Sequence, residues 1–306
     1  MKIVVVGAGG VGGYFGARLA ADGNEVTFVA RGAHAEAMRR DGLKLLSPLG
    51  DLLIRPVRLL ADPLATGLVD IVLLSVKMYD LEATAELIRP LLQIDTAVVP
   101  LQNGVEAVEL LGRRLGRRYV CGGIAYISAT IEAPGVVRHA GGAARLVLGE
   151  LAPSDSWRLE TLQAACTGAG IEAELAPDIT RELWRKLIFL APFAAATCLA
   201  RAPIGVVRAD AERWQAFRAM VEEAVAVACA RGVRLPADTA AERIAFTQAL
   251  PAAMCSSMLH DLEAGRRLEL DWLTGAVVRL GREAGVATPV SEAAYAALQP
   301  FAAGTA

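Results

Sequence analysis

The chain has 306 residues, of which 54% are hydrophobic and 21% charged, a balance that excludes a disordered chain. This length is enough for two domains, each with its own hydrophobic core. The formal net charge of −2 gives no general basis for binding nucleic acid or an anionic membrane.

The N-terminal segment has the order strand, glycine turn, helix, strand. Apolar runs cover residues 2–6 and 25–30, and a helix is expected over 14–21. Between them, one glycine permits a tight turn, a second lets the backbone approach a pyrophosphate at a helix N-terminus, and a third lets the helix pack closely on the sheet. This order predicts a Rossmann-like unit that binds a dinucleotide. The residues expected to do so are Gly7, Ala8, Gly9, Gly10, Val11 and Gly12.

The end of the second strand indicates which dinucleotide is bound. Enzymes that use NAD usually carry Asp or Glu there, to hold the ribose hydroxyls. This chain instead has Arg31, whose guanidinium can pair with a 2′-phosphate. The sequence therefore favours NADP (NADPH), the alternative being that Arg31 is a solvated loop residue.

Strand and helix patterns alternate through the first half of the chain and give way to helices in the second. Strands are expected over 69–76, 97–101, 119–131, 136–148 and 171–175, and helices over 81–92 and 105–115. The later helical segments cover 179–200, 211–231, 238–250 and 270–284. The predicted fold class is α/β, with a Rossmann-like dinucleotide-binding domain over 1–176 and an all-helical domain over 177–306.

Targeting, membrane and metal signals are weak. The glycines of the first turn argue against a signal peptide, and the closest approach to a membrane span, residues 187–200, is too short and contains Pro192. Five scattered cysteines fit reduced thiols in a cytoplasmic protein. The chain has only three histidines, which argues against a His-based metal site.

Polar residues follow two of the apolar strands. Lys77 comes after the run 69–76, and Asn103 comes after 97–101. Ligands of open α/β sheets bind beyond the carboxyl ends of the strands, which places both residues at the expected ligand edge. The alternatives remain a solvated lysine at a strand end and an Asn103–Gly104 turn pair without a ligand.

The helical half contributes two further candidates. Lys186 shares a helical stripe with Leu190, Ala194 and Thr197, so burial should lower its pKa towards that of a useful acid; the alternative is a lysine that extends to solvent. The polar run 256–271 can be a solvated loop, but Glu269 and Asp271 alternate with leucines, which predicts that one of these acids faces inward.

Together these features resemble the 2-dehydropantoate 2-reductase (ketopantoate reductase) family over nearly the whole chain. The resemblance rests on the glycine turn and on the motifs Val76-Lys77, LQNG at 101–104, W-x-K-L at 184–187, Ser256-Ser257-Met258 with Asp261, and Gly265-Arg266 with Glu269-Leu270-Asp271. It implies a dinucleotide-binding domain followed by a helical domain, and NADPH-dependent reduction of a small-molecule 2-keto acid.

The resemblance also implies residue roles. Lys186 matches the general acid that protonates the substrate carbonyl oxygen, and Glu269 matches the acid that organises cofactor and substrate. Ser257 matches the hydroxyl that binds the substrate carboxylate, and Asn103 matches a residue contacting nicotinamide and substrate. Arg31 and Lys77 match positions near the cofactor phosphates and ribose, and the backbone of Ala129 matches a further cofactor contact.

The chain departs from the family pattern at three substrate-binding asparagines, whose positions hold Leu190, Ala194 and Ile204. A site that hydrogen-bonds a hydroxyl discriminates through that bond, and an apolar wall does not. Three functions therefore stay open: a true ketopantoate reductase, a relative with a more apolar carbonyl substrate, and a non-catalytic NADP-binding protein. The apolar helical faces fit either a homodimer or internal packing.

Overall fold

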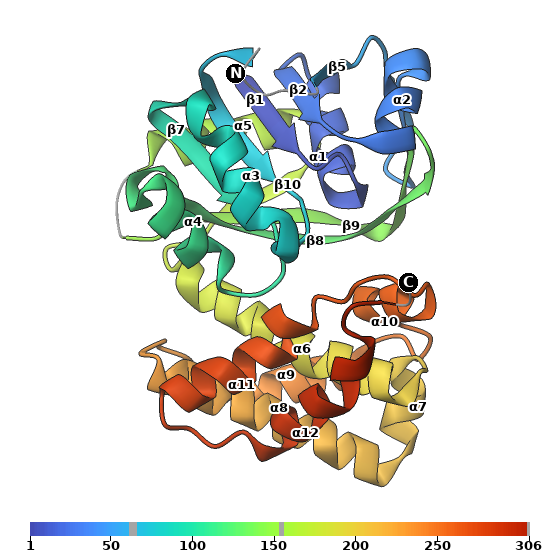
Figure 1. Cartoon of the computed structure of the whole chain (residues 1–306), viewed down its shortest axis with the longest axis vertical. Coiled ribbons are helices and arrows are strands. Elements are labelled where there is room, and N and C mark those ends of the chain that lie inside the picture. The colour runs from blue at the N-terminus through green and yellow to red at the C-terminus, as the bar shows by residue number, and fades with distance from the viewer. Residues whose placement is uncertain (61–65, 153–155, 305–306) are drawn as a thin grey trace. The chain divides into compact units, whose positions relative to one another are not determined.

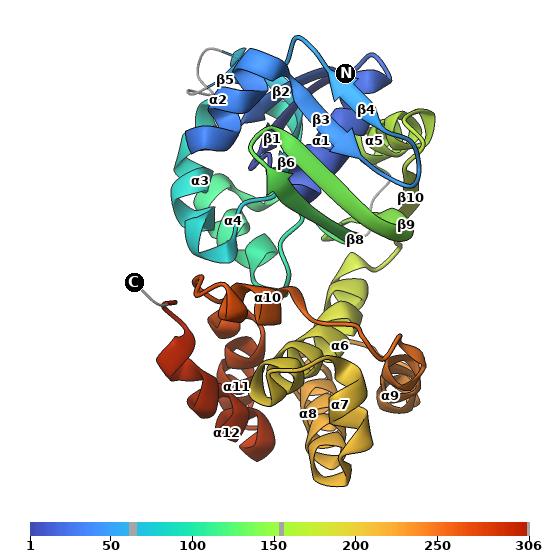
Figure 2. The ribbon, with the colours of Figure 1, turned by 90° about the vertical axis from the view of Figure 1, so that its right-hand side faces the viewer.

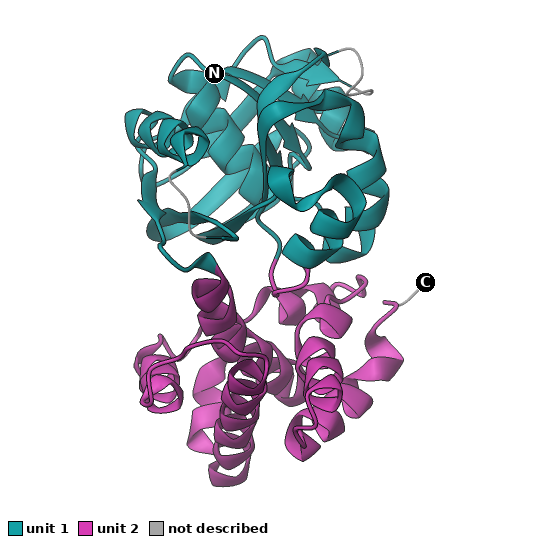
Figure 3. Ribbon diagram, turned by 90° about the vertical axis from the view of Figure 1, so that its left-hand side faces the viewer, with its two compact units in different colours: residues 1–102, 107–179 teal, residues 103–106, 180–306 magenta. Residues whose placement is uncertain are grey.

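A computed structural model describes residues 1–60, 66–152 and 156–304 and divides the chain into two compact units (Figures 1 and 3). Unit 1 contains residues 1–102 and 107–179, and unit 2 contains residues 103–106 and 180–306. The predicted class is confirmed: unit 1 is α/β with a parallel sheet, and unit 2 is helical.

The first sheet of unit 1 is five-stranded and parallel, in the order β5-β2-β1-β6-β7. Its strands are β1 (Lys2–Val6), β2 (Glu25–Val29), β5 (Arg58–Leu60), β6 (Val69–Leu74) and β7 (Leu92–Pro100). β1 and β6 are almost wholly buried, as expected for central strands of a parallel sheet. The carboxyl ends of β1, β2, β6 and β7 therefore share one edge.

A second sheet in unit 1 was not predicted as a separate layer. Its order is β10-β9-β3-β4, with β8 paired to β9, and its strands are β3 (Leu43–Leu46), β4 (Leu52–Ile54), β8 (Cys121–Ala133), β9 (Val136–Glu150) and β10 (Glu172–Leu175). Strands β8 and β9, both predicted from the sequence, pair as an antiparallel hairpin whose turn contains Gly135 with a φ of +78°. Figure 2 shows this long hairpin alongside β3.

Helices of unit 1 connect the strands and complete its core. They are α1 (Gly10–Ala21), α2 (Gly32–Asp41), α3 (Leu81–Ile88), α4 (Ala107–Leu115) and α5 (Trp157–Gly168). Tyr14, Phe15 and Leu19 of α1 are fully buried together with Phe28 of β2 and Leu146 of β9, so α1 lies in the core that both sheets share. The short segments η2 (Met78–Asp80), η3 (Arg89–Leu91) and η4 (Arg117–Tyr119) are 3-10 turns.

Unit 2 is built around a long central helix, α6 (Ile179–Ala200), which continues through Pro192. The other helices are α7 (Ile204–Ala209), α8 (Ala211–Ala230), α9 (Thr239–Ala249), α10 (Ser257–Glu263), α11 (Thr274–Glu283) and α12 (Pro289–Leu298), with 3-10 turns η5 (Leu270–Trp272) and η6 (Gln299–Phe301). By length and composition alone α6 is apolar enough to span a membrane, but 67% of its most apolar window is buried in the structure. It thus has the character of a core helix.

Candidate active site

The glycine-rich turn joins β1 to α1 at the carboxyl edge of the parallel sheet. Gly7 has a φ of +94°, and a Cβ there would lie 2.8 Å from the Ser75 backbone. A Cβ on Gly12 would lie 2.2 Å from the Gly7 carbonyl oxygen, so only glycine allows α1 to begin this close to the turn. These contacts give Gly7 and Gly12 the roles that their spacing predicts.

The turn also fits an incoming anionic group. A Cβ built on Gly9 would meet no atom of the described residues within 4 Å, so its backbone borders open space. Gly10 and Val11 begin α1, and the first amides of a helix have no acceptors within the helix. A pyrophosphate would supply those acceptors. Ala8, by contrast, is buried and only 3% exposed.

Two further polar atoms at this edge support the same fit. Ser75 Oγ and Gln102 Oε1 are buried and lack a hydrogen-bond partner among the described residues, although Gln102 Nε2 donates to the Val76 carbonyl at 3.0 Å. They follow β6 and β7, whose carboxyl ends lie beside that of β1. Buried polar groups are almost always satisfied, and these two atoms are available to a polar molecule bound at this edge.

The hairpin strand β8 approaches the first turn of α1. A Cβ on Gly10 would lie 2.0 Å from the carbonyl oxygen of Ala129, so the two backbones are in direct contact. The structure thus brings Ala129 to the glycine turn from a distant part of the sequence. Its predicted backbone contact with the cofactor remains a prediction.

Arg31 has a partner that the sequence did not reveal. It stands at the N-cap of α2, with its side chain 89% exposed, and its Nη2 lies 2.9 Å from Asp80 Oδ2. Asp80 follows β6 on the short turn η2, which Lys77 caps. An acid therefore lies near the end of β2 after all, contributed by a segment 49 residues away. Nothing in the local sequence around Arg31 could have indicated this pairing.

Lys186 lies on α6 in unit 2 with its side chain partly buried. Burial lowers the pKa of the Lys186 ammonium from 10.5 to about 8, and the negative charge of Glu269 acts in the opposite direction. Glu269 is only 7% exposed, which confirms that one acid of the alternating pair faces inward. Asp271 is the other, and it accepts a hydrogen bond from the Tyr295 hydroxyl at 2.7 Å. The unit therefore holds a lysine that can give up its proton near neutral pH.

Asn103 belongs to the same unit as Lys186 and Glu269. Residues 103–106 group with the helices: a Cβ on Gly104 would lie 2.8 Å from the Trp272 carbonyl oxygen, and Glu106 pairs with Arg279 of α11. Gly104 has a φ of +100°, which explains the glycine after the asparagine. Asn103 is partly exposed at the start of this segment.

The two serines before α10 have different roles. Ser256 is the N-cap: its Oγ accepts from the Leu259 amide at 3.0 Å and lies 2.8 Å from Thr197 Oγ1. Ser257 is exposed as the first residue of the helix. Asp261 accepts from Arg266 Nε at 2.8 Å, which ties the following turn to the helix. Of this group, Ser257 is the residue with a hydroxyl not used for capping.

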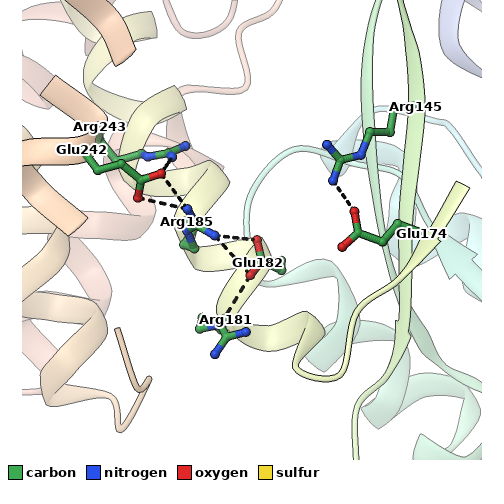
Figure 4. Close-up of polar contacts among 7 residues, drawn as sticks. All are labelled: Arg145, Glu174, Arg181, Glu182, Arg185, Glu242 and Arg243. Carbon is green, nitrogen blue, oxygen red and sulfur yellow. Dashed lines mark hydrogen bonds and ion pairs between the residues drawn. The ribbon is translucent and has the colours of Figure 1, made fainter. Parts of the chain in front are cut away.

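A chain of ion pairs joins the Lys186 turn of α6 to α9 (Figure 4). Arg185 Nη2 lies 2.8 Å from Glu242 Oε1, and Arg185 Nη1 lies 3.3 Å from Glu182 Oε2. Arg181 and Arg243 extend the chain at its two ends. Burial opposes the charge of Arg185, but its two carboxylate partners raise its pKa overall. These contacts fix the helical turn that carries Lys186.

The three positions that hold asparagine in the family pattern have different surroundings here. Ala194 and Ile204 are 1% and 0% exposed and belong to the core cluster of unit 2. Leu190 is partly exposed. Phe189 beside it stacks on Phe193 at 5.2 Å and contacts Phe246 of α9 at 5.1 Å between ring centroids. The helix face one turn beyond Lys186 is therefore apolar.

A glycine turn shaped for a pyrophosphate in one unit, and a lysine with a lowered pKa and an acidic neighbour in the other, define a dinucleotide-dependent oxidoreductase. The chain belongs to the ketopantoate reductase family: residues 3–153 match the family model "Ketopantoate reductase PanE/ApbA", and residues 178–302 match "Ketopantoate reductase PanE/ApbA C terminal". The chain is thus an oxidoreductase that acts on a CH–OH group and its carbonyl counterpart.

Individual relatives agree with this assignment and leave the substrate open. A 2-dehydropantoate 2-reductase from Mesorhizobium japonicum is 34% identical, with 99% of this chain and 98% of the relative covered. An uncharacterized oxidoreductase of Bacillus subtilis, YkpB, is 33% identical, with 98% and 99% covered. The crystal structure of a ketopantoate reductase from Ralstonia eutropha JMP134 matches with a TM-score of 0.90 at 32% identity, with 99% and 98% covered.

Proposed function

We propose that this protein reduces a 2-keto acid to the 2-hydroxy acid with NADPH, as 2-dehydropantoate 2-reductases do for 2-dehydropantoate. The observation that carries the proposal is Lys186, whose pKa is lowered to about 8 while Glu269 supplies a nearby negative charge. At neutral pH such a lysine is still mostly protonated, and it releases its proton far more readily than an exposed lysine does. A non-catalytic dinucleotide-binding protein would gain nothing from this costly arrangement.

The chain's own residues account for the proton transfer. NADPH, when bound at the glycine turn, would supply the hydride that the carbonyl carbon accepts. Lys186 Nζ donates a proton to the carbonyl oxygen, and before transfer its positive charge stabilises the negative charge that develops there. Glu269 holds the lysine in its charged form, and Ser257 and Asn103 bind the substrate carboxylate and orient the carbonyl.

The preference for NADPH rests on Arg31. Its exposed guanidinium is suited to a 2′-phosphate, and the phosphate would replace Asp80 as its partner. Lys77 and the Ala129 backbone add contacts to the same cofactor, with the glycine turn at its pyrophosphate. In this proposal residues 1–176 form the cofactor domain and residues 177–306 the catalytic domain, acting in the cytoplasm. The free state of all five cysteines supports that location.

A second candidate is reduction of a more apolar 2-keto acid by the same machinery. Leu190 favours it, because this partly exposed apolar side chain lies one helical turn from Lys186. An apolar substituent packs on such a face, whereas a hydroxyl placed there loses hydrogen bonds.

The test is the rate of NADPH oxidation with 2-dehydropantoate and with 2-keto acids that carry branched aliphatic or aromatic side chains. Lys186→Met serves as the inactive control. Highest kcat/KM for 2-dehydropantoate supports the first candidate, and highest kcat/KM for an apolar keto acid supports the second. If no 2-keto acid is reduced faster by the wild type than by Lys186→Met, the proposal is wrong.

A further inference from the structure

His34 connects three segments of unit 1 that are far apart in the sequence. It lies on α2, partly buried, and its Nε2 is 2.9 Å from the carbonyl oxygen of Ala8 in the glycine turn. Its Nδ1 is 3.0 Å from the backbone nitrogen of Gly135, in the turn of the β8–β9 hairpin. Both ring nitrogens are therefore engaged with backbone groups.

The chemistry of these partners fixes the protonation state of the ring. The Gly135 amide can only donate, so Nδ1 must accept and carries no proton. The Ala8 carbonyl can only accept, so Nε2 must carry the proton and donate it. Only the neutral ring protonated at Nε2 satisfies both contacts, and a charged imidazolium cannot.

Both contacts bear on the place where a dinucleotide pyrophosphate would bind. In a planar trans peptide the C=O and N–H bonds point in opposite directions, so holding the Ala8 carbonyl towards His34 directs the Gly9 amide away from it. The second contact holds the hairpin whose strand β8 presses the Ala129 carbonyl against Gly10. One side chain thus sets both the orientation of a peptide in the glycine turn and the anchoring of the hairpin beside it.

We infer that His34 is a positioning residue for the dinucleotide: its two hydrogen bonds hold the glycine turn and the β8–β9 hairpin in the arrangement that receives the pyrophosphate. The inference rests on dinucleotide binding at this turn and is independent of the keto acid and of the choice between NADPH and NADH. His34 need not touch the cofactor, because it acts through the backbone of Ala8 and Gly135.

Protonation gives this role a pH signature. Burial lowers the pKa of His34, and the Ala8 carbonyl acts in the opposite direction. Glu36 lies on the same helix, Glu132 and Arg138 pair with each other on the hairpin, and the glycine turn has no titratable side chain. The ring is neutral at pH 7, and acid would place a second donor against the Gly135 amide. Dinucleotide affinity should therefore fall as His34 becomes protonated.

Two variants of the full chain separate the hydrogen bonds from the shape of the ring. His34→Phe keeps a ring but neither bond, and His34→Gln keeps one donor and one acceptor without a titratable group in this range. We expect the Kd for NADPH and NADH, measured by nucleotide fluorescence at pH 7.5, to rise about tenfold in His34→Phe, the loss expected when a buried donor and acceptor go unpaired. His34→Gln should stay within about threefold of wild type, and kcat at saturating NADPH should change little in either variant.

The pH profile is read as the ratio of the wild-type Kd to the His34→Gln Kd, because titration of the 2′-phosphate is common to both proteins and cancels. This ratio should increase as the pH falls through the pKa of His34, which burial places below its ordinary value of 6.5. His260→Gln, which alters an exposed histidine, should show the same pH dependence of Kd as wild type. Amide hydrogen exchange at Gly135 should be faster in His34→Phe than in wild type.

Equal affinity of His34→Phe and wild type, an equal loss of affinity in His34→Gln and His34→Phe, or a Kd ratio that does not change with pH would each overturn the inference. Equal Kd values for NADPH and NADH in wild type would contradict the proposed preference for NADPH and would leave the inference about His34 intact.

Discussion

Replacing Glu269 by Gln should move the pH dependence of reduction without removing the proton donor. In wild type, log kcat/KM for the keto acid should fall above about pH 8, where Lys186 loses its proton. The Glu269 charge raises the pKa of Lys186, and removing an opposite charge of this kind lowers a neighbouring pKa by about one unit. The descending limb should then begin near pH 7. At pH 8 the protonated fraction would fall from about one half to about one tenth, a roughly fivefold loss.

The assay is the initial rate of NADPH oxidation at low keto acid concentration over about pH 5.5 to 9.5. Near pH 6 both proteins hold a protonated lysine, so any loss that remains there reports a different role of Glu269, such as binding the substrate. Asp271→Asn is the matched control, because it removes a neighbouring carboxylate that accepts a hydrogen bond from Tyr295. In this variant log kcat/KM should still begin to fall at about pH 8, as in wild type. An unshifted limb in Glu269→Gln, or an equal shift in Asp271→Asn, would refute the electrostatic link between Glu269 and Lys186.

Three other changes test separate parts of the proposal. Arg31→Ala should weaken NADPH binding about tenfold and NADH binding little, whereas Asp80→Asn should tighten NADPH by removing a competing carboxylate; equal effects on both nucleotides in a fluorescence titration would count against a 2′-phosphate contact. Lys186→Met should lower kcat by about 10²- to 10⁴-fold and leave NADPH binding intact. The same variant should raise the free energy of unfolding at pH 7 by roughly 1 to 3 kcal/mol in urea titrations, because a charge whose burial lowers its pKa destabilises the folded state below that pKa. Leu190→Asn should raise kcat/KM for 2-dehydropantoate relative to an apolar keto acid about tenfold, and an unchanged ratio would show that this position does not contact the substrate.

Periodicity predicted most of the elements that form the two cores. The run Val69–Leu74 and the helix Ile179–Ala200 are clear in the sequence because extensive burial favours long runs of apolar residues in both. Short elements such as Leu52–Ile54 and Arg58–Leu60 were not predicted. Three residues give too little pattern, and these strands exist because a neighbouring edge was available to pair with them.

The site was only partly predictable, for a different reason. The glycine turn and the alternation that buries Glu269 are local patterns. The pairing of Arg31 with Asp80 depends on which strands become neighbours, and so does the bridge from His34 to Gly135. Such contacts are set by topology, and a single sequence carries no local signal for them.

In the proposed function, helix α6 carries the proton donor, Lys186, and a substrate-contacting position, Leu190, on successive turns. Arg185 anchors the Lys186 turn to α9 through carboxylates, and this support does not involve Leu190 one turn further on. Of the three positions that hold asparagine in the family pattern, Ala194 and Ile204 are buried in the core of unit 2, and Leu190 is partly exposed. In the proposed function, a change of substrate therefore needs to alter only one side chain beside Lys186, and it can leave the proposed proton donor, its acidic neighbour and the Arg185 ion pairs as they are.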